Sequence, residues 1–140
     1  MIAFADTAVV RMARTTVGEL VERGAQLSFD ESPEDGTAIL PAPRLATDVT
    51  ADSGNPRTVI AITDTEVTDA DTDAAADLIA QLNAPALTVI TPTDVDITPD
   101  WHAMFPWEHR AEADVGSAGS TSLAIAEALA HATGQSVSRN

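Results

Sequence analysis

The sequence predicts an α/β domain: a three-layer, Rossmann-like fold with a mostly parallel sheet, helices on both faces and an antiparallel edge strand. Two observations support this prediction. The apolar runs Arg57–Thr63 and Ala86–Ile90 are typical of strands buried on both faces, as in parallel sheets. Helical patterns alternate with these runs in the second half of the chain, as parallel βαβ units require.

The first half of the chain carries weaker signals. Residues Ile2–Ala5 and Ala8–Met12 predict an antiparallel pair of strands, with a helix as the competing interpretation because alanine is frequent there. Val17–Gln26 has an apolar stripe and predicts a helix. A further helix is predicted over Pro43–Thr50, because proline fits only the first turn of a helix.

The second half is more regular. A helix is predicted from the acidic stretch Asp69–Asp73 to Leu82, since carboxylates favour a helix N-terminus. Thr91–Trp107 contains three prolines and is predicted to be irregular, and Arg110–Val115 to be a short strand. The helix Ser120–Thr133 is predicted from a capping hydroxyl at its start and Gly134 at its end.

The core-facing side of that last helix is predicted to carry five of its apolar residues. These are Leu123, Ile125, Ala126, Leu129 and Ala130. Together the elements predict one domain over residues 1–134, followed by a flexible tail over 135–140.

Composition limits the function classes. The chain has 140 residues, 22 of them acidic and 7 basic, with a net charge of −15 and no cysteine or lysine. This balance disfavours nucleic acid and anionic membranes as partners, because both need clustered basic residues. It resembles the proteins of salt-loving organisms, whose surface carboxylates stay hydrated while salt screens their repulsion. The alternative to a salt-loving source is a high-GC bacterium or its phage, in which the protein is acidic by chance. No membrane span or signal peptide is visible, so a cytoplasmic location is expected.

Three ordered motifs resemble the von Willebrand factor type A domain. They are Ile2–Ala8 (IAFADTA), Asp35–Ile39 (DGTAI) and Thr58–Asp64 (TVIAITD). In that family a strand ending in F-x-D/N-x-A is followed by a G-T loop, and then by a buried strand ending in T-D-G. The resemblance covers nearly the whole chain.

The resemblance implies a metal-ion-dependent adhesion site. In the family, three loops hold Mg²⁺ or Mn²⁺, and a partner carboxylate completes the shell. Thr37 matches the hydroxyl ligand of the second loop, and Asp64 matches the carboxylate of the third. Both are oxygen ligands of the kind that Mg²⁺ requires. The structural alternatives are an N-cap hydroxyl for Thr37 and a strand-end carboxylate for Asp64.

The chain departs from the family pattern in two places. Thr65 stands where the family has glycine. The first strand and its D-x-S-x-S loop are missing, so the domain is expected to be N-terminally incomplete and to be completed by a partner chain, an upstream segment or a rearranged sheet.

A few further residues are candidates for contact with a partner. They are Asp35, Thr65 and Glu66 beside the predicted metal ligands, and the tryptophans Trp101 and Trp107, since tryptophan anchors interfaces. The alternatives are a turn residue for Asp35 and a local apolar cluster for the tryptophans. A second metal group could form from Asp100, His102, Glu108 and His109, although their spacing follows no helical register.

These observations predict a protein-interaction module and no enzyme. The resemblance adds an AAA+ ATPase as a partner class. The alternative is a metal-free structural subunit of a larger assembly, viral or homo-oligomeric, in a halophile. A small hydrolase is the third hypothesis; Ser120, His102 and Asp64 could be combined for it, but nothing in their spacing selects them.

Overall fold

The computed structural model describes seven stretches of the chain, which form two compact units. The stretches are 2–4, 7–10, 38–51, 57–68, 71–84, 86–114 and 116–136. The first unit comprises Met1–Asp52 and Val67–Ala70, and the second comprises Ser53–Glu66 and Asp71–Asn140. The single domain predicted over 1–134 stays a prediction, and each unit is described by itself.

The described residues of the first unit form an antiparallel pair of strands and one helix. Strand β1 (Ile2–Phe4) pairs with β2 (Ala8–Val10), with Phe4 opposite Ala8. Helix α2 (Pro41–Thr50) packs against both strands and begins at a proline, as the fixed φ of proline allows. The predicted strand pair is therefore confirmed. Among the described residues it forms a two-stranded sheet of its own, not an edge of the parallel sheet.

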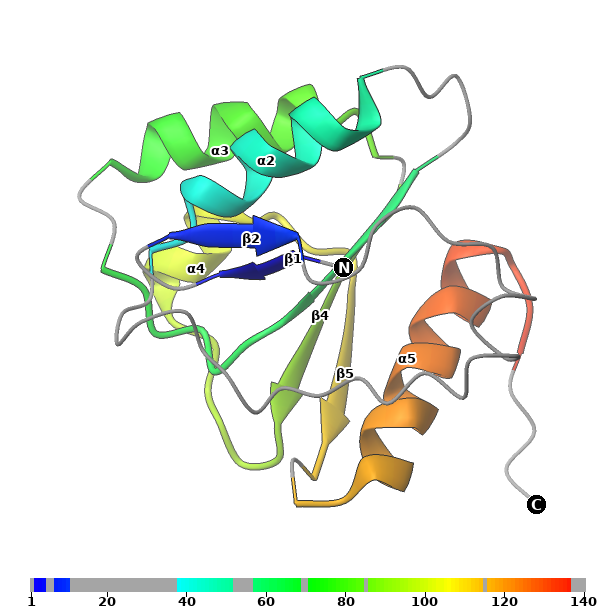
Figure 1. The fold of residues 1–140 in the computed structure, drawn as a ribbon. Helices are drawn as coiled ribbons and strands as arrows, with labels where there is room; N and C mark the ends of the chain where they lie inside the picture. The colour runs from blue at the N-terminus through cyan, green and yellow to red at the C-terminus, as the bar shows by residue number, and fades with distance from the viewer. Residues whose placement is uncertain are drawn as a thin grey trace. The chain divides into compact units, whose positions relative to one another are not determined.

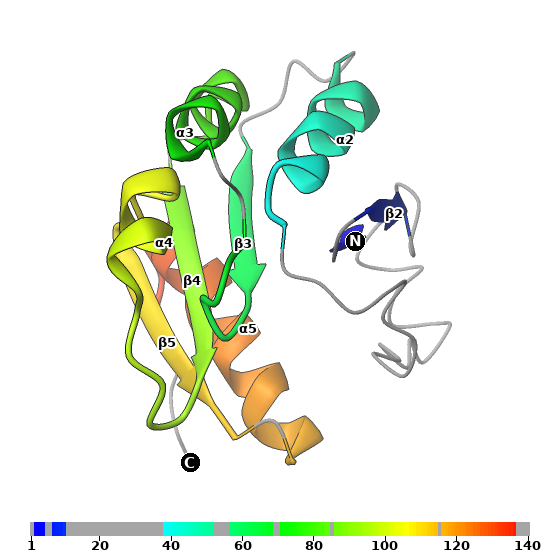
Figure 2. The same cartoon turned by 90° about the vertical axis from the view of Figure 1, so that its left-hand side faces the viewer.

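The second unit contains a three-stranded parallel sheet. Its strands β3 (Thr58–Ile62), β4 (Ala86–Pro92) and β5 (His109–Ala113) lie in the order β3-β4-β5. The arrowheads of β3 and β4 point to the same end of the unit (Figure 2). The predicted α/β class is confirmed, and two of the apolar runs that predicted it form adjacent strands.

Helices cover both faces of this sheet. Helix α3 (Thr72–Gln81) joins β3 to β4, helix α4 (Pro99–Met104) joins β4 to β5, and the two helices pack against each other. Right-handed crossovers that advance in one direction along a sheet put both helices on one face. Helix α5 (Ala118–Ala132) follows β5 and packs on the other face, beside β5 (Figure 1).

The core on the α5 face is built from small residues. Ile90, Ala111 and Ala113 of the sheet pack with Ala124 and Ala128 of α5, and all five are less than a tenth exposed. The prediction that Leu123 and Leu129 face this core is wrong, because their exposed fractions are 37% and 49%. Alanine on both surfaces lets the helix approach the sheet closely, which turns the leucines outward.

Three further sequence predictions differ from the structure. The segment predicted to be irregular contains α4, whose N-cap is Thr98 and whose first residue is Pro99. Strand β4 continues two residues beyond the predicted Ile90. Helix α5 begins two residues earlier than predicted, because the hydroxyl of Ser117 caps it. The predicted helix Val17–Gln26 lies outside the described residues, as do 137–140 of the predicted tail.

No helix in the described part of the chain is long and apolar enough to cross a membrane.

Candidate functional site

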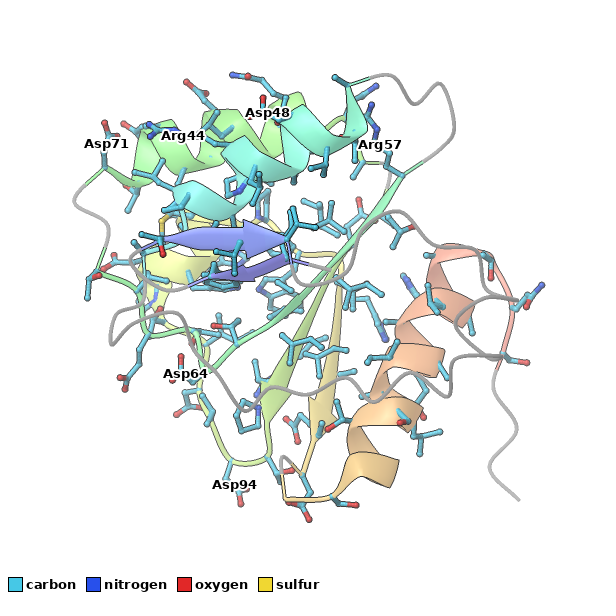
Figure 3. The ribbon with its side chains drawn as sticks, in the orientation of Figure 1. Arg44, Asp48, Arg57, Asp64, Asp71 and Asp94 are labelled. Carbon is cyan, nitrogen blue, oxygen red and sulfur yellow. The ribbon has the colours of Figure 1, made fainter. Side chains whose placement is uncertain are left out.

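The loops that follow the three parallel strands gather at one edge of the sheet. Residues 63–66 follow β3, residues 93–98 follow β4, and Asp114 follows β5. The labelled side chains of Asp64 and Asp94 both lie at this end of the second unit (Figure 3). In open α/β sheets this carboxyl edge is where ligands bind.

Thr65 is the structural centre of the edge. Its φ of 66° is in the left-handed region, which a β-branched residue rarely adopts, and its side chain is 0% exposed. The N–H of Thr65 donates to the hydroxyl Oγ1 of Thr63 at 3.0 Å. The backbone conformation is thus the one that glycine would adopt freely, while the side chain is that of a buried polar residue.

The hydroxyl of Thr65 joins the first loop to the second. It donates to the carbonyl of Asp96 and accepts from the N–H of Thr98, both at 3.2 Å. The hydroxyl of Thr98 returns a bond to the carbonyl of Thr65 at 2.8 Å, and it also accepts the N–H of Trp101 at 3.2 Å. The strained residue is therefore held by three hydrogen bonds to the 93–98 loop and, through Thr98, to the start of α4.

Arg110 holds the same loop from the β5 side. Its Nη2 donates to the carbonyl of Val95 at 2.6 Å and to Oγ1 of Thr91 at 3.1 Å. The guanidinium also lies 3.2 Å from a carboxylate oxygen of Glu112. Charged donors make the stronger hydrogen bonds, so this contact fixes the loop on β4 and β5.

The groups that these contacts leave in solvent are mostly carboxylates. The Oδ1 atom of Asp64 accepts the backbone N–H of Glu66 at 3.2 Å, so the short turn orients the Asp64 carboxylate. Asp94, like Thr65, has a φ of 66°. The exposed acidic residues of the edge are Asp64, Glu66, Asp94, Asp96 and Asp114.

The structure brings together three of the residues predicted from the sequence, namely Asp64, Thr65 and Glu66. The predicted metal ligand Thr37 and the predicted contact residue Asp35 lie outside the described residues. Within the part of the chain that the structure describes, no three histidine or acidic side chains are placed to hold a metal ion. The described donors at the edge therefore do not fit a metal centre by themselves.

The two predicted tryptophan contacts are placed differently. Trp101 is 0% exposed and its ring packs against Phe105 with centroids 5.4 Å apart, so the prediction that it contacts a partner is wrong. It is a core residue because α4 turns its ring inward. Trp107 is half-buried and lies edge-on to His102, with centroids 5.8 Å apart. The indole N–H groups of both tryptophans are buried without a hydrogen-bond partner.

The second metal group considered from the sequence is not assembled. Asp100, His102, Glu108 and His109 are all described, and they do not converge. The ring of His109 stacks instead on that of His131, with centroids 4.2 Å apart. The hydroxyl of Ser120, considered for a hydrolase, accepts the N–H of Asp114 at 2.9 Å.

Sequence reasoning missed the residues that support the edge. Thr98 followed by Pro99 is a typical N-cap and first-turn pair, and it could have revealed α4 and the anchoring hydroxyl. The role of Arg110 could not be predicted from neighbouring residues, because its hydrogen-bond partners are 15 and 19 residues away in the chain.

Comparison with protein-family models and with curated proteins gives no match for this chain. The resemblance to von Willebrand factor type A domains stays a prediction from the sequence motifs.

Proposed function

We propose that this chain is a protein-interaction module of the von Willebrand A type, which binds a partner protein through the carboxyl edge of its parallel sheet, at Asp64 and Glu66. The observation that carries the proposal is Thr65. A non-glycine residue with φ of 66° and a fully buried side chain is an unfavourable local conformation, which the surrounding structure must hold in place.

Such strain is concentrated at sites where the chain must present groups in a fixed geometry. Here the groups on either side of Thr65 are the exposed carboxylates of Asp64 and Glu66. A turn fixed in this way loses little conformational entropy when a partner binds, which increases affinity. The strand-end position agrees with the general location of ligand sites in open α/β sheets.

The charge of the edge indicates the chemistry of the contact. Five exposed carboxylates favour a partner that brings positive charge, as arginine or lysine side chains do. The sequence resemblance adds Mg²⁺ or Mn²⁺ as a bridging ion and an AAA+ ATPase as a partner class. Because the described donors form no metal centre by themselves, a bridging ion would need further ligands beyond them.

The test compares two variants with the same change of charge. Asp64→Asn removes the charge but keeps an oxygen that can accept the Glu66 N–H. Asp77→Asn makes the same change on the exposed surface of α3, away from the edge. Each is used as bait in crosslinking and affinity capture from the native cell extract. We expect wild type and Asp77→Asn to retain the same binding protein and Asp64→Asn to lose it.

The same capture with added Mg²⁺, and with a chelator, separates two forms of the proposal. Equal capture in both supports a direct carboxylate contact, and capture that needs Mg²⁺ supports the metal-assisted form. Retention of the same partner at equal strength by Asp64→Asn would contradict both.

A second candidate function is supported by a different surface. The fully exposed residues of α5 from Gly119 to Leu129 are uncharged and include Leu123 and Leu129, while Glu127 in the same span is half-buried. In a chain with a net charge of −15, an uncharged face is where copies can meet with least repulsion. This observation favours the metal-free structural subunit. Light scattering in high salt tests it: an isolated monomer at all protein concentrations would contradict this function.

A further inference from the structure

A pair of histidines joins the end of α5 to the start of β5. The rings of His109 and His131 stack with centroids 4.2 Å apart and an interplanar angle of 11°. His109 is the first residue of β5, and His131 lies in the last turn of α5. The pair therefore lies at the amino end of the parallel strands, away from the carboxyl edge proposed for partner binding.

The surroundings of His109 contain few groups that could stabilise a positive charge. On α5, Glu127 lies one turn before His131 and acts on His109 electrostatically. On β4, the residue opposite His109 is Thr88, whose hydroxyl is buried without a hydrogen-bond partner. On the same face of β3, residues 58, 60 and 62 are uncharged.

The charged neighbours of His109 on its own strand are directed elsewhere or exposed. Arg110 lies on the opposite face of β5, where it bonds Thr91 and Val95. Glu108 is exposed, and its N–H bonds the carbonyl of Leu87 at 3.0 Å. Among the described acidic groups, Glu127 on α5 therefore acts on the ring, and it favours the protonated form.

Two neutral imidazoles can stack in this way, whereas two imidazolium ions at the same distance repel each other. We propose that the His109–His131 stack is a pH-sensitive latch, which holds the last turns of α5 on β5 near neutral pH and releases them on acidification. Released turns would no longer hold Ala124 and Ala128 on Ile90, Ala111 and Ala113.

The electrostatics give the direction of the effect. Partial burial of His109, followed by the nearby His131, lowers its pKa from the ordinary value of 6.5, while Glu127 acts in the opposite direction. The unfolded chain then binds more protons than the folded one when the pH falls below 6.5. The contribution to stability is complete above this pH and is lost as the pH falls.

Thermal unfolding of the full chain tests the latch. The melting temperature is measured at constant high salt from about pH 8 to pH 5.5, above the range in which ordinary carboxyl groups titrate. Wild type is expected to lose melting temperature as the pH falls, and His131→Gln to lose measurably less, because the variant removes the repulsion between the two histidines and leaves the burial of His109. The matched control His102→Gln removes a histidine that contacts Trp107 and takes no part in the stack; it should keep the wild-type slope. A wild-type melting temperature independent of pH, or equal slopes in wild type and His131→Gln, would overturn the proposal.

A measurement on wild type alone covers the case in which the variant does not fold. Proton NMR of the three histidine Cε1–H signals follows each titration directly. The latch requires one ring to titrate below about 6.5, the value of an unperturbed histidine. It also requires the amides of residues 128–133 to lose protection from exchange as that ring is protonated. Three unperturbed titrations, or constant protection, would overturn the inference.

Discussion

Thr65 has a strained backbone conformation and also makes the hydrogen bonds that hold this conformation in place. Left-handed backbone costs of order 1 kcal/mol or more for a residue with a Cβ, and a β-branched residue is among the least suited to it. Three hydrogen bonds to the 93–98 loop, of about 1 kcal/mol each, are enough to offset that cost. Two of the three use the hydroxyl of Thr65 itself, so the residue that causes the strain also holds the conformation.

The hydroxyl can be removed without changing the shape of the side chain. Thr65→Val keeps the branched side chain and the strained backbone, but leaves the carbonyl of Asp96 and the N–H of Thr98 without this partner. We expect a loss of about 1–3 kcal/mol in the free energy of unfolding, measured by urea denaturation. Thr65→Ser keeps the hydroxyl and should retain most of the stability. Equal losses in the two variants would contradict a dominant role of the hydrogen bonds, because Thr65→Ser keeps the hydroxyl and loses only the methyl group.

The sequence predicted residues of the candidate site only where they adjoin a clear sequence pattern, such as an apolar strand or a family motif. Asp64 follows an apolar strand, and the resemblance placed Thr65 where glycine is usual; the observed φ of 66° is one that glycine adopts freely. Trp101 was misplaced, because residue type alone does not distinguish an aromatic anchor of an interface from one in the core. Arg110 was missed because its contacts come from tertiary structure.

At the scale of elements, α5 shows that the pattern of apolar residues can predict a helix without predicting which of its faces is buried. Its sequence is apolar on nearly every side, so the helix was predicted correctly while its buried face was not. The predicted core side combined Leu123, Ile125 and Leu129 with two alanines. The sheet instead presents alanines of β5, and close approach to them requires alanines on the helix. By contrast, β3 and β4 were predicted nearly to their ends, because β-branched runs between turns have few alternative structures.

From the packing of α5 we expect substitutions at two of its alanines to have different effects on stability. Ala128 is 0% exposed against β5, whereas Ala126 is exposed on the same helix. Ala128→Leu should overpack the interface and lower the free energy of unfolding by about 1–3 kcal/mol. Ala126→Leu adds the same atoms in solvent and should change stability by less than about 0.5 kcal/mol. Urea denaturation of both variants checks the orientation of the helix. A larger loss in Ala126→Leu would show that the opposite face is buried.

At the scale of the whole molecule, net charge is the dominant feature. The chain has 22 acidic residues and 7 basic ones, and two of the acidic residues lie at the start of α3. These are Asp71 and Asp73, both exposed. The side chain of Asp71 caps α3 by accepting the N–H of Ala74 at 2.9 Å. Local structure thus uses some of the acidic residues, while the sum of their charges opposes the compact state.

Salt should therefore stabilise the folded protein, and the range of salt concentration that is effective identifies the cause. The Debye length falls from about 10 Å at 0.1 M to about 3 Å at 1 M, so repulsion between separated carboxylates is largely screened below about 1 M. We expect the melting temperature in KCl to rise steeply over that range and then to level off. Calorimetric scans from about 0.05 M to 3 M KCl measure the curve. The melting temperature could instead begin to rise only above 1 M and then increase linearly. That result would indicate that salt is excluded from the protein surface, an effect that strengthens apolar burial and does not depend on charge screening. Scans in sucrose at matched osmolality provide the control, because an uncharged solute acts through exclusion and does not screen charge.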